Sequence, residues 1–593
     1  MKHRTAPPSR RAVALLLAAA LFAASVVLSL GVVLSDARAA TTETVSFQET
    51  ATKTRLAGTW YRTGADRAVV LVADPDADRA ALRAAALAFV RRGFDAFAVD
   101  LPGQGSSAGR LPFATAAFSA DAGTSARLAA AVGDAVAAFL ARSGFASDRV
   151  VLAGHGLGAR AVLRFAAERA AGAPPFAGLV LIGVDASGSD AWLARLGPGS
   201  PGLPVALLSG TADDVLPPEA AKILYERLSG EDARLFPGSR GTGPYDAETW
   251  LSADGRALLS LHDGTPHRLA VESPALLAQA ATLARDWTAG PASDAAASET
   301  DARAADARRQ GVRIAALLLL ALGAAATLVL LRRAPAADST SASAPDAAQG
   351  LPSVPAALGL RLLLWVPALL AAALLAALAA GLSALLGFGV PTAPAVATLL
   401  ALGGCGLAGL LAARAFPDTY VTLARPEGAG PVLALRLRSG RPLRRPAALA
   451  AGVGLLALLA AAVVLFHGTG GPTLAAPPVR LLWTGLLGAA AFPGFLHLLR
   501  EEVALAAARP NLPARVAFQL LRYLPFFILP ILAAALGSPS VAGGAIIGVV
   551  DLLLALAAGR AALLGTGRRA VAALVAALSL AFLAAVQGTL AGF

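Results

Sequence analysis

The chain has 593 residues, of which 56% are hydrophobic, and its mean hydropathy of +0.65 is higher than a water-soluble protein of this size needs. The formal net charge of +12 comes mainly from arginines that flank apolar stretches, so we interpret them as membrane-topology signals and expect no nucleic-acid partner. The single cysteine, Cys405, excludes an intrachain disulfide and a multi-cysteine metal site, and we expect neither a metal nor a cofactor.

The first forty residues predict a membrane anchor. Basic residues up to Arg11 precede an uncharged apolar run over 12–34, which is long for a signal-peptide core and suits a spanning helix. The sequence Ala-Arg-Ala at 37–39 nevertheless resembles a cleavage site. We favour an uncleaved anchor over 1–40, with a cleaved signal peptide as the alternative. Both interpretations place the following domain outside the cytoplasm.

Residues 41–289 have the pattern of a water-soluble α/β domain. Short apolar runs indicate strands at 69–72, 94–100, 150–152, 178–184 and 204–209, and helical periodicity lies between them. Strands that alternate with helices predict a mostly parallel sheet covered by helices on both faces.

The remainder of the chain predicts a polytopic, all-α transmembrane bundle of about eight helices over 311–593. A polar, low-complexity stretch at 290–310 is expected to be a linker without a packed core. We place the spans near 312–331, 362–386, 393–413, 447–466, 481–499, 516–537, 540–559 and 570–590. Arginine-rich loops alternate with loops that lack Lys and Arg, which predicts a multi-pass cell-membrane protein with a cytoplasmic N-terminus. Arg308, Arg309 and Arg313 are exceptions, because they lie on the predicted outer side.

The stretch DRVVLAGHGLGARAVLRFAAER, residues 148–169, reads as strand, sharp turn and helix. Gly154, Gly156 and Gly158 give it the spacing of a nucleophile elbow, G-x-S-x-G, in which the nucleophile stands at the tip of a strained turn. Here the central residue is Gly156, which has no side chain to attack a carbonyl. His155, before the tip, is interpreted as a packing residue.

Three other motifs occur in the order expected with this elbow, and together they resemble the α/β-hydrolase superfamily over about residues 44–288. DLPGQGSS, residues 100–107, is similar to the family's D-x-x-G-x-G-x-S turn, so its two serines are interpreted as turn-formers. A strand followed by GTADDVLP resembles the loop of the acid, which implies Asp213, with Asp214 as a second choice. His267 lies where the family places its base, before a helix expected at 274–287.

The chain departs from the family at two positions that would take part in the reaction. The nucleophile is absent at Gly156, and Ala73-Asp74 stands where active members often carry His-Gly beside the oxyanion hole. The N–H groups of Leu157 and Ala73 are the candidate oxyanion donors. The resemblance therefore implies Asp213, His267 and the degenerate position Gly156 as the site.

In the bundle, the candidate polar residues are Arg522, Asp551 and His497, because ionisable groups in hydrocarbon are costly. The simpler interpretation is that Arg522 reaches the cytoplasmic face and that Asp551 pairs with an arginine. Glu501-Glu502 is similar to an intramembrane CAAX-type protease motif, but the partner histidines and arginine spacing are not evident, so we reject this interpretation.

Three functions remain open from the sequence. The first is a membrane-anchored pseudo-hydrolase whose outer domain binds a lipid, acyl, peptidoglycan or protein ligand. The second is an active ester or acyl hydrolase in which His267 and Asp213 activate water or another nucleophile. The third is a transporter or assembly protein, with the membrane bundle as the functional part and the outer domain as a sensor.

Overall fold

The computed structural model describes residues 10–332, with gaps at 75–77, 80, 106, 109–121, 170–174, 185–190, 214, 234–238, 241–246 and 290–294, and in the C-terminal half residues 403, 485, 488–496, 498, 551–559, 562 and 569–586. The strands are β1 (Thr41–Gln48), β2 (Arg55–Arg62), β3 (Ala68–Val72), β4 (Asp95–Asp100), β5 (Val150–His155), β6 (Gly178–Ile182), β7 (Val205–Gly210), β8 (Ser239–Arg240), β9 (Ala247–Leu251) and β10 (Ala257–His262). The α-helices are α1 (Arg10–Ala39), α2 (Arg83–Val90), α3 (Ala122–Ser143), α4 (Leu157–Glu168), α5 (Ala191–Ala194), α6 (Pro218–Ser229), α7 (Pro274–Ala289), α8 (Ala295–Arg332) and α17 (Arg569–Val586). Two short 3-10 helices are η1 (Ser147–Arg149) and η2 (His267–Glu272).

All the described strands form one sheet in the order β1-β2-β4-β3-β5-β6-β7-β10-β9-β8. The six central strands from β4 to β10 are mutually parallel, and antiparallel hairpins extend the sheet at both edges. The mostly parallel sheet is therefore confirmed. The sequence analysis did not identify the β1–β2 hairpin or the β8–β9 extension.

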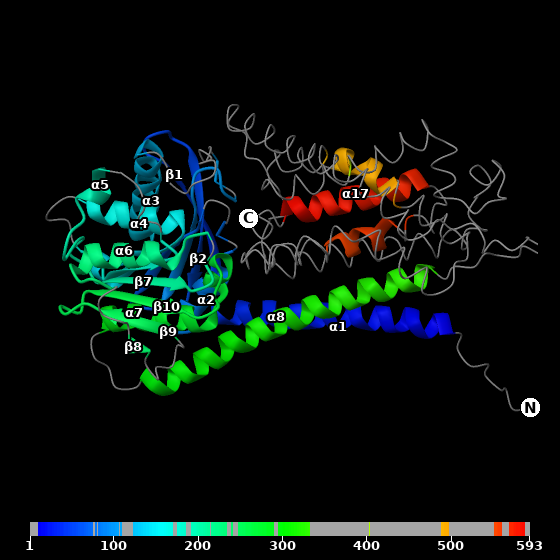
Figure 1. Cartoon of the computed structure of the whole chain (residues 1–593), viewed down its shortest axis with the longest axis horizontal. Coiled ribbons are helices and arrows are strands. Elements are labelled where there is room, and N and C mark those ends of the chain that lie inside the picture. Colours follow the sequence, from blue (N-terminus) through cyan, green and yellow to red (C-terminus); the bar gives the residue numbers. More distant parts are fainter. Residues whose placement is uncertain are drawn as a thin grey trace, which may run out of the picture.

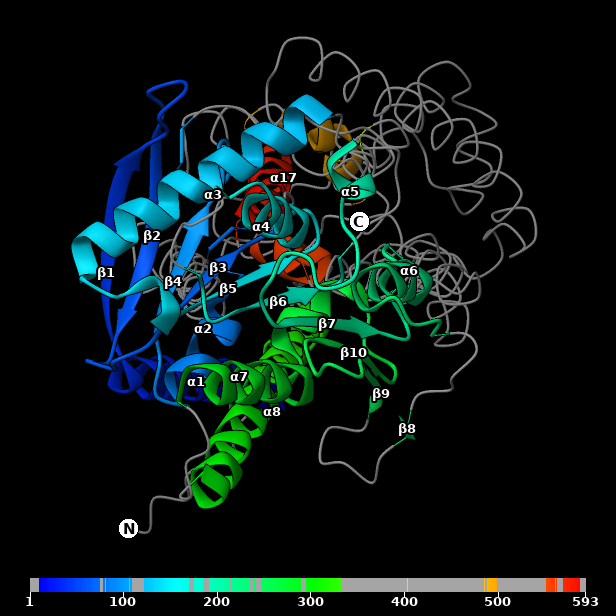
Figure 2. The ribbon, with the colours of Figure 1, turned by 90° about the vertical axis from the view of Figure 1, so that its left-hand side faces the viewer.

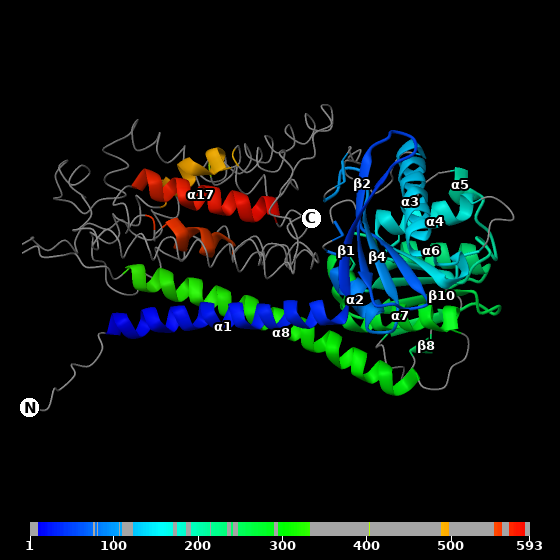
Figure 3. The same cartoon turned by 180° about the vertical axis from the view of Figure 1, so that it is seen from behind.

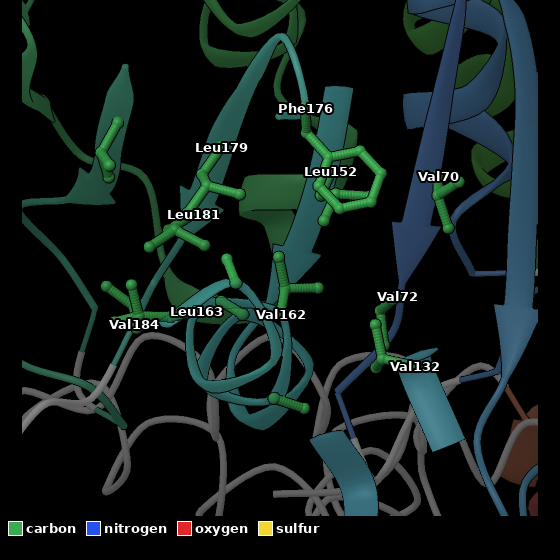
Figure 4. Packing of buried hydrophobic residues seen from close by; sticks show 14 of the residues in the cluster. Val70, Val72, Val132, Leu152, Val162, Leu163, Phe176, Leu179, Leu181 and Val184 are labelled. Carbon is green, nitrogen blue, oxygen red and sulfur yellow. The ribbon is translucent and has the colours of Figure 1, made fainter. Parts of the chain in front are cut away.

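Alternate residues of the central strands face two separate hydrophobic cores. In β3, Val70 and Val72 belong to one core, whereas Val69 and Leu71 belong to the other. Helices α3, α4, α5 and α6 cover the first face, and α2 and α7 cover the second (Figure 2). Figure 4 shows side chains from β3, β5 and β6 facing those of α4 in the first core. Because both faces are buried, the central strands read as continuous apolar runs in the sequence.

Helices α1 and α8 lie side by side and extend together away from the sheet domain (Figures 1 and 3). They run antiparallel, since Ser25 Oγ donates to Ala316 O at 2.8 Å and Phe22 packs opposite Gly323. Helix α1 leads directly into β1, with only Ala40 between them. The chain thus approaches the sheet domain along α1 and leaves it along α8.

A buried network of ion pairs joins the domain to these two helices. Arg92, two residues beyond the end of α2, binds both carboxylate oxygens of Glu299, at 2.8 and 2.9 Å, and one oxygen of Asp306 at 2.9 Å. Asp36 of α1 receives Arg309 at 3.1 Å and Arg83 at 3.2 Å. Side chains from α1, α2 and α8 therefore neutralise one another at the junction.

This network corrects the expectation of a linker at 290–310, because α8 begins at Ala295 and its acidic residues are packed against the domain. Glu299, Ala302 and Asp306 are all buried and are spaced three and four residues apart, so they form one helical face. Two of the arginines that lie on the predicted outer side have carboxylate partners. Arg309 is bound by Asp36, and Arg313 is bound by Glu272 at 3.1 Å.

The C-terminal half is described only in part. Residues 488–496, 551–559 and α17 are helical and share a small apolar core that includes Ala491, Phe495 and Ala577. They overlap the predicted spans 481–499, 540–559 and 570–590, and α8 contains 312–331. The spans 362–386, 393–413 (except Gly403), 447–466 and 516–537 lie outside the described residues. In the part of the chain that the structure describes, one helical segment, Ala20–Ala39, is long and apolar enough to cross a membrane.

Candidate active site of a hydrolase-like domain

The backbone at Gly156 keeps the shape of a nucleophile elbow without the nucleophile. Strand β5 ends at His155, Gly156 has φ 57° and ψ −124°, and α4 begins at Leu157. A side chain at this φ is strained, and glycine relieves that strain. The flanking glycines are required by close packing, because a Cβ on Gly154 would lie 2.6 Å from the backbone of Ala159, and one on Gly158 would overlap the backbone of β3.

The space of the missing side chain is taken by Asp74, which follows β3. A Cβ built on Gly156 would overlap the Asp74 carboxylate, so a serine and Asp74 cannot occupy their places together. Asp74 Oδ1 accepts the N–H of Leu157 at 2.7 Å. Leu157 is the residue after the elbow tip, and its N–H is the donor that meets the developing oxyanion in active members of this fold. A fixed carboxylate of the protein therefore already holds the predicted oxyanion donor.

The predicted acid and base do lie together. His267 Nδ1 donates to Asp213 Oδ2 at 2.8 Å, and Asp213 Oδ1 accepts the N–H groups of Val215 at 3.1 Å and Leu216 at 2.7 Å. The other ring nitrogen, Nε2, lies 3.2 Å from Asp74 Oδ2. His267 thus bridges two carboxylates, and its Nε2 points to Asp74 instead of a serine hydroxyl.

Charge and burial fix the protonation of this group. Burial would lower the pKa of His267, but its hydrogen bonds to Asp213 and Asp74 outweigh burial and raise the pKa to about 10. Burial would raise the pKa of Asp74, but the hydrogen bond from His267 and its positive charge outweigh burial and lower the pKa. At neutral pH, His267 is therefore an imidazolium between two carboxylates, and such a group cannot accept a proton.

His155 lies against the same group. Its ring stacks on that of His267 with 4.4 Å between centroids and 30° between planes. His155 Nε2 lies 3.0 Å from the carbonyl oxygen of His267, which can only accept, so Nε2 carries the hydrogen. Burial lowers the pKa of His155 to about 4, so the ring is neutral at pH 7. Its packing role was expected, but its position beside Asp74 was not.

The structure also describes three further residues that the sequence analysis singled out. Ala73 is fully buried beside Asp74. Ser107 is a turn-former, because its hydroxyl donates to the carbonyl oxygen of Asp100 and accepts the N–H of Ala57. Asp551 is 5% exposed within the helical segment 551–559, far along the chain from the elbow.

The positions Asp214, Ser106, His497 and Arg522 lie outside the described residues, as do Glu501 and Glu502.

Sequence reasoning missed the role of Asp74, which it noted only as a departure from His-Gly. A second missed residue is Gln104, whose Nε2 donates to the Asp74 carbonyl oxygen at 2.5 Å while its Oε1 accepts the N–H of Leu101 at 2.7 Å. Gln104 therefore fixes the backbone that carries the carboxylate. A signal for Asp74 did exist, since an acidic residue stands at the expected oxyanion turn of a chain that has glycine at the expected nucleophile position.

Comparison with solved structures gives hydrolases and esterases. An esterase from Pyrococcus furiosus has 15% identity and a TM-score of 0.30, covering 42% of this chain and 92% of its own. An esterase from Thermogutta terrifontis has 17% identity and a TM-score of 0.28, covering 41% and 97%. The esterase domain of a Rhodothermus marinus protein has 15% identity and a TM-score of 0.28, covering 42% and 98%. No family model and no curated protein matches the chain.

The fold class follows from the order of the strands in the sheet and from the strand, turn and helix around Gly156. The described part of residues 41–289 has the sheet order and the strand-turn-helix of the α/β-hydrolase fold.

Proposed function

We propose that this domain is a pseudo-hydrolase held at the outer face of a membrane. The observation that carries the proposal is Asp74, whose carboxylate fills the place of the serine side chain and accepts the Leu157 N–H at 2.7 Å. Serine hydrolysis needs a nucleophile, a free base and an oxyanion donor. In the described part of the domain, Gly156 offers no nucleophile, and Asp74 engages both the base and the donor.

Direct activation of water by His267 is disfavoured by the same contacts. A base must present an unprotonated nitrogen to the water, but His267 Nε2 lies 3.2 Å from the carboxylate of Asp74. Both side chains are buried, with exposures of 1% and 0%. The ligand, whether a lipid, an acyl group, peptidoglycan or a protein, stays a prediction.

Membrane anchoring is supported by α1 and α8. Asp36 lies near the C-terminal end of α1 and is bound by Arg309 of α8 and by Arg83 of the domain. Cleavage at the Ala-Arg-Ala sequence would remove this buried carboxylate from between two partly buried arginines, which favours an uncleaved anchor. The cytoplasmic N-terminus and the multi-pass arrangement remain part of the proposal.

The test is labelling of the full chain in detergent with a fluorophosphonate, which reacts with activated serines. We expect no labelling of the natural chain and no turnover of short-chain aryl esters. The double variant Gly156→Ser with Asp74→Gly is the positive control, because it supplies a serine and frees His267 and the Leu157 N–H. Adding His267→Ala to the double variant should abolish its labelling.

Two results would contradict the proposal. Labelling of the natural chain as fast as the double variant would show a working serine elsewhere. Ester turnover by the natural chain that Asp74→Asn abolishes would show that the Asp74 carboxylate is itself the nucleophile.

A further inference from the structure

We propose that Asp74, His155 and His267 form a binding site for one zinc ion in the former nucleophile pocket. A carboxylate oxygen of Asp74 and one ring nitrogen from each histidine lie within 4.8 Å of one another, and all three residues are buried. The inference uses the same residues as the proposed function but does not depend on it. The sequence analysis expected no metal because it considered the single cysteine and not a pair of histidines 112 positions apart.

The distances already approach those of a zinc ligand set. Zinc lies about 2.0–2.1 Å from nitrogen and oxygen ligands, so two ligands of a tetrahedral ion are about 3.3 Å apart. His267 Nε2 and Asp74 Oδ2 are 3.2 Å apart. An ion would replace the proton that these two atoms now share, and the remaining ligand would close in from within 4.8 Å.

The other hydrogen bonds of the two histidines decide which ring nitrogen of each is available to an ion. His267 Nδ1 donates to Asp213, which leaves Nε2 for the ion once its proton is lost. His155 Nε2 donates to a carbonyl oxygen, so Nδ1 carries the lone pair, and this atom is buried without a hydrogen-bond partner among the described residues. Metal-binding histidines characteristically donate the opposite nitrogen to a carboxylate or a carbonyl. Both arrangements are present here, on the two rings of one site.

Charge and coordination number favour zinc. Two carboxylates, those of Asp74 and Asp213, lie 3.2 and 2.8 Å from the ring nitrogens of His267. A divalent cation at this place would balance the two carboxylates, which reduces the cost of their burial. Iron with two histidines and one carboxylate needs three further positions, whereas a tetrahedral ion needs one, which suits a site with fully buried ligands.

The experiment measures zinc in the full chain, purified in detergent through a tag without histidines. We expect about one tightly bound zinc per chain after gel filtration, and less than about a tenth of that in His155→Phe and in Asp74→Asn. His262→Phe is the matched control and should keep the zinc, because His262 of β10 is as buried as His155 but its Nε2 bonds Gln279 of α7. Asp213→Asn should keep the stoichiometry but weaken the affinity by about 10–100-fold.

The inference would be overturned if the natural chain and His155→Phe bound the same amount of zinc, either no zinc in both or one ion per chain in both. If the variants do not fold, cobalt added to the natural chain decides, since a tetrahedral visible spectrum supports the site and its absence overturns it. The two proposals fail separately. A chain that is silent to fluorophosphonate and free of zinc removes only the metal site, whereas labelling of the natural chain removes only the pseudo-hydrolase.

Discussion

Restoring the serine alone should damage the domain without restoring chemistry. In Gly156→Ser the new Cβ overlaps the Asp74 carboxylate, so Asp74 must move. It then loses its bonds to the Leu157 N–H, at 2.7 Å, and to His267 Nε2, at 3.2 Å. A hydrogen bond to a charged group contributes about 1.5–3 kcal/mol, so the two together amount to about 3–6 kcal/mol. A domain of this size should then melt about 10 °C lower.

Thermal unfolding of the full chain and fluorophosphonate labelling measure both halves of this prediction. Gly156→Ala introduces the same Cβ without a hydroxyl, so it should lose nearly the same stability, which separates the collision from the chemistry. Adding Asp74→Gly to Gly156→Ser should recover part of the stability and all of the labelling. A singly substituted Gly156→Ser chain that labels rapidly and melts like the natural chain would refute the account of Asp74.

The remaining predictions concern the junction and the elbow. Arg92→Ala should cost about 1.5–3 kcal/mol, because it removes hydrogen bonds to two buried carboxylates, which keep Arg303 and Arg91 as partners. Arg142→Ala, at an exposed pair with Glu43, should cost at most about 1 kcal/mol, and denaturant unfolding that shows equal losses would contradict this difference. Burial would raise the pKa of Glu299, but the hydrogen bonds from Arg92 and Arg303 lower it. The contribution of Glu299 to the free energy of unfolding is therefore complete above its unfolded pKa and is lost as the pH falls through the lowered value. Protease cleavage within 295–310 should increase at acid pH, and cleavage that does not change with pH would contradict this role of Glu299. Gly158→Ala should destabilise the fold by about 1–3 kcal/mol or more through overlap with β3, and the open position Gly197→Ala is its control in the same melting assay. Intact-mass measurement of the membrane-bound chain should find α1 still attached, and a chain that begins after residue 39 would contradict the anchor.

Local patterns in the sequence were sufficient for the centre of the domain. The buried parallel strands appear as apolar runs, and three glycines at alternate positions mark the elbow, because close packing at Gly154 and Gly158 permits no Cβ. The edge hairpin β1–β2 was missed, since β1 is half exposed and mixes Thr, Glu and Gln with Val and Phe. An edge strand needs fewer apolar residues, so its pattern is weak.

Site residues could be predicted from the sequence only where each one belonged to a local motif. Asp213 and His267 each followed a recognisable strand, and the structure places them 2.8 Å apart. The role of Asp74 depends on contacts with residues 83 and 193 positions further along the chain, which periodicity does not reveal. The stretch 290–310 was misjudged for a related reason. Its composition is polar, but the spacing of Glu299 and Asp306 on one face is amphipathic and depends on Arg92 for its partner.

The buried ion pairs at the junction also determine where the folding unit ends. A fragment cut at 41 and 289, the limits of the hydrolase-like domain, would lack Asp36, Glu299 and Asp306. Arg92, which is 4% exposed, would then lose its carboxylate partners on α8. The smallest autonomous piece therefore includes the end of α1 and the first turns of α8. Its charges come from three segments, so we expect the sheet domain, the end of α1 and the start of α8 to fold as one unit.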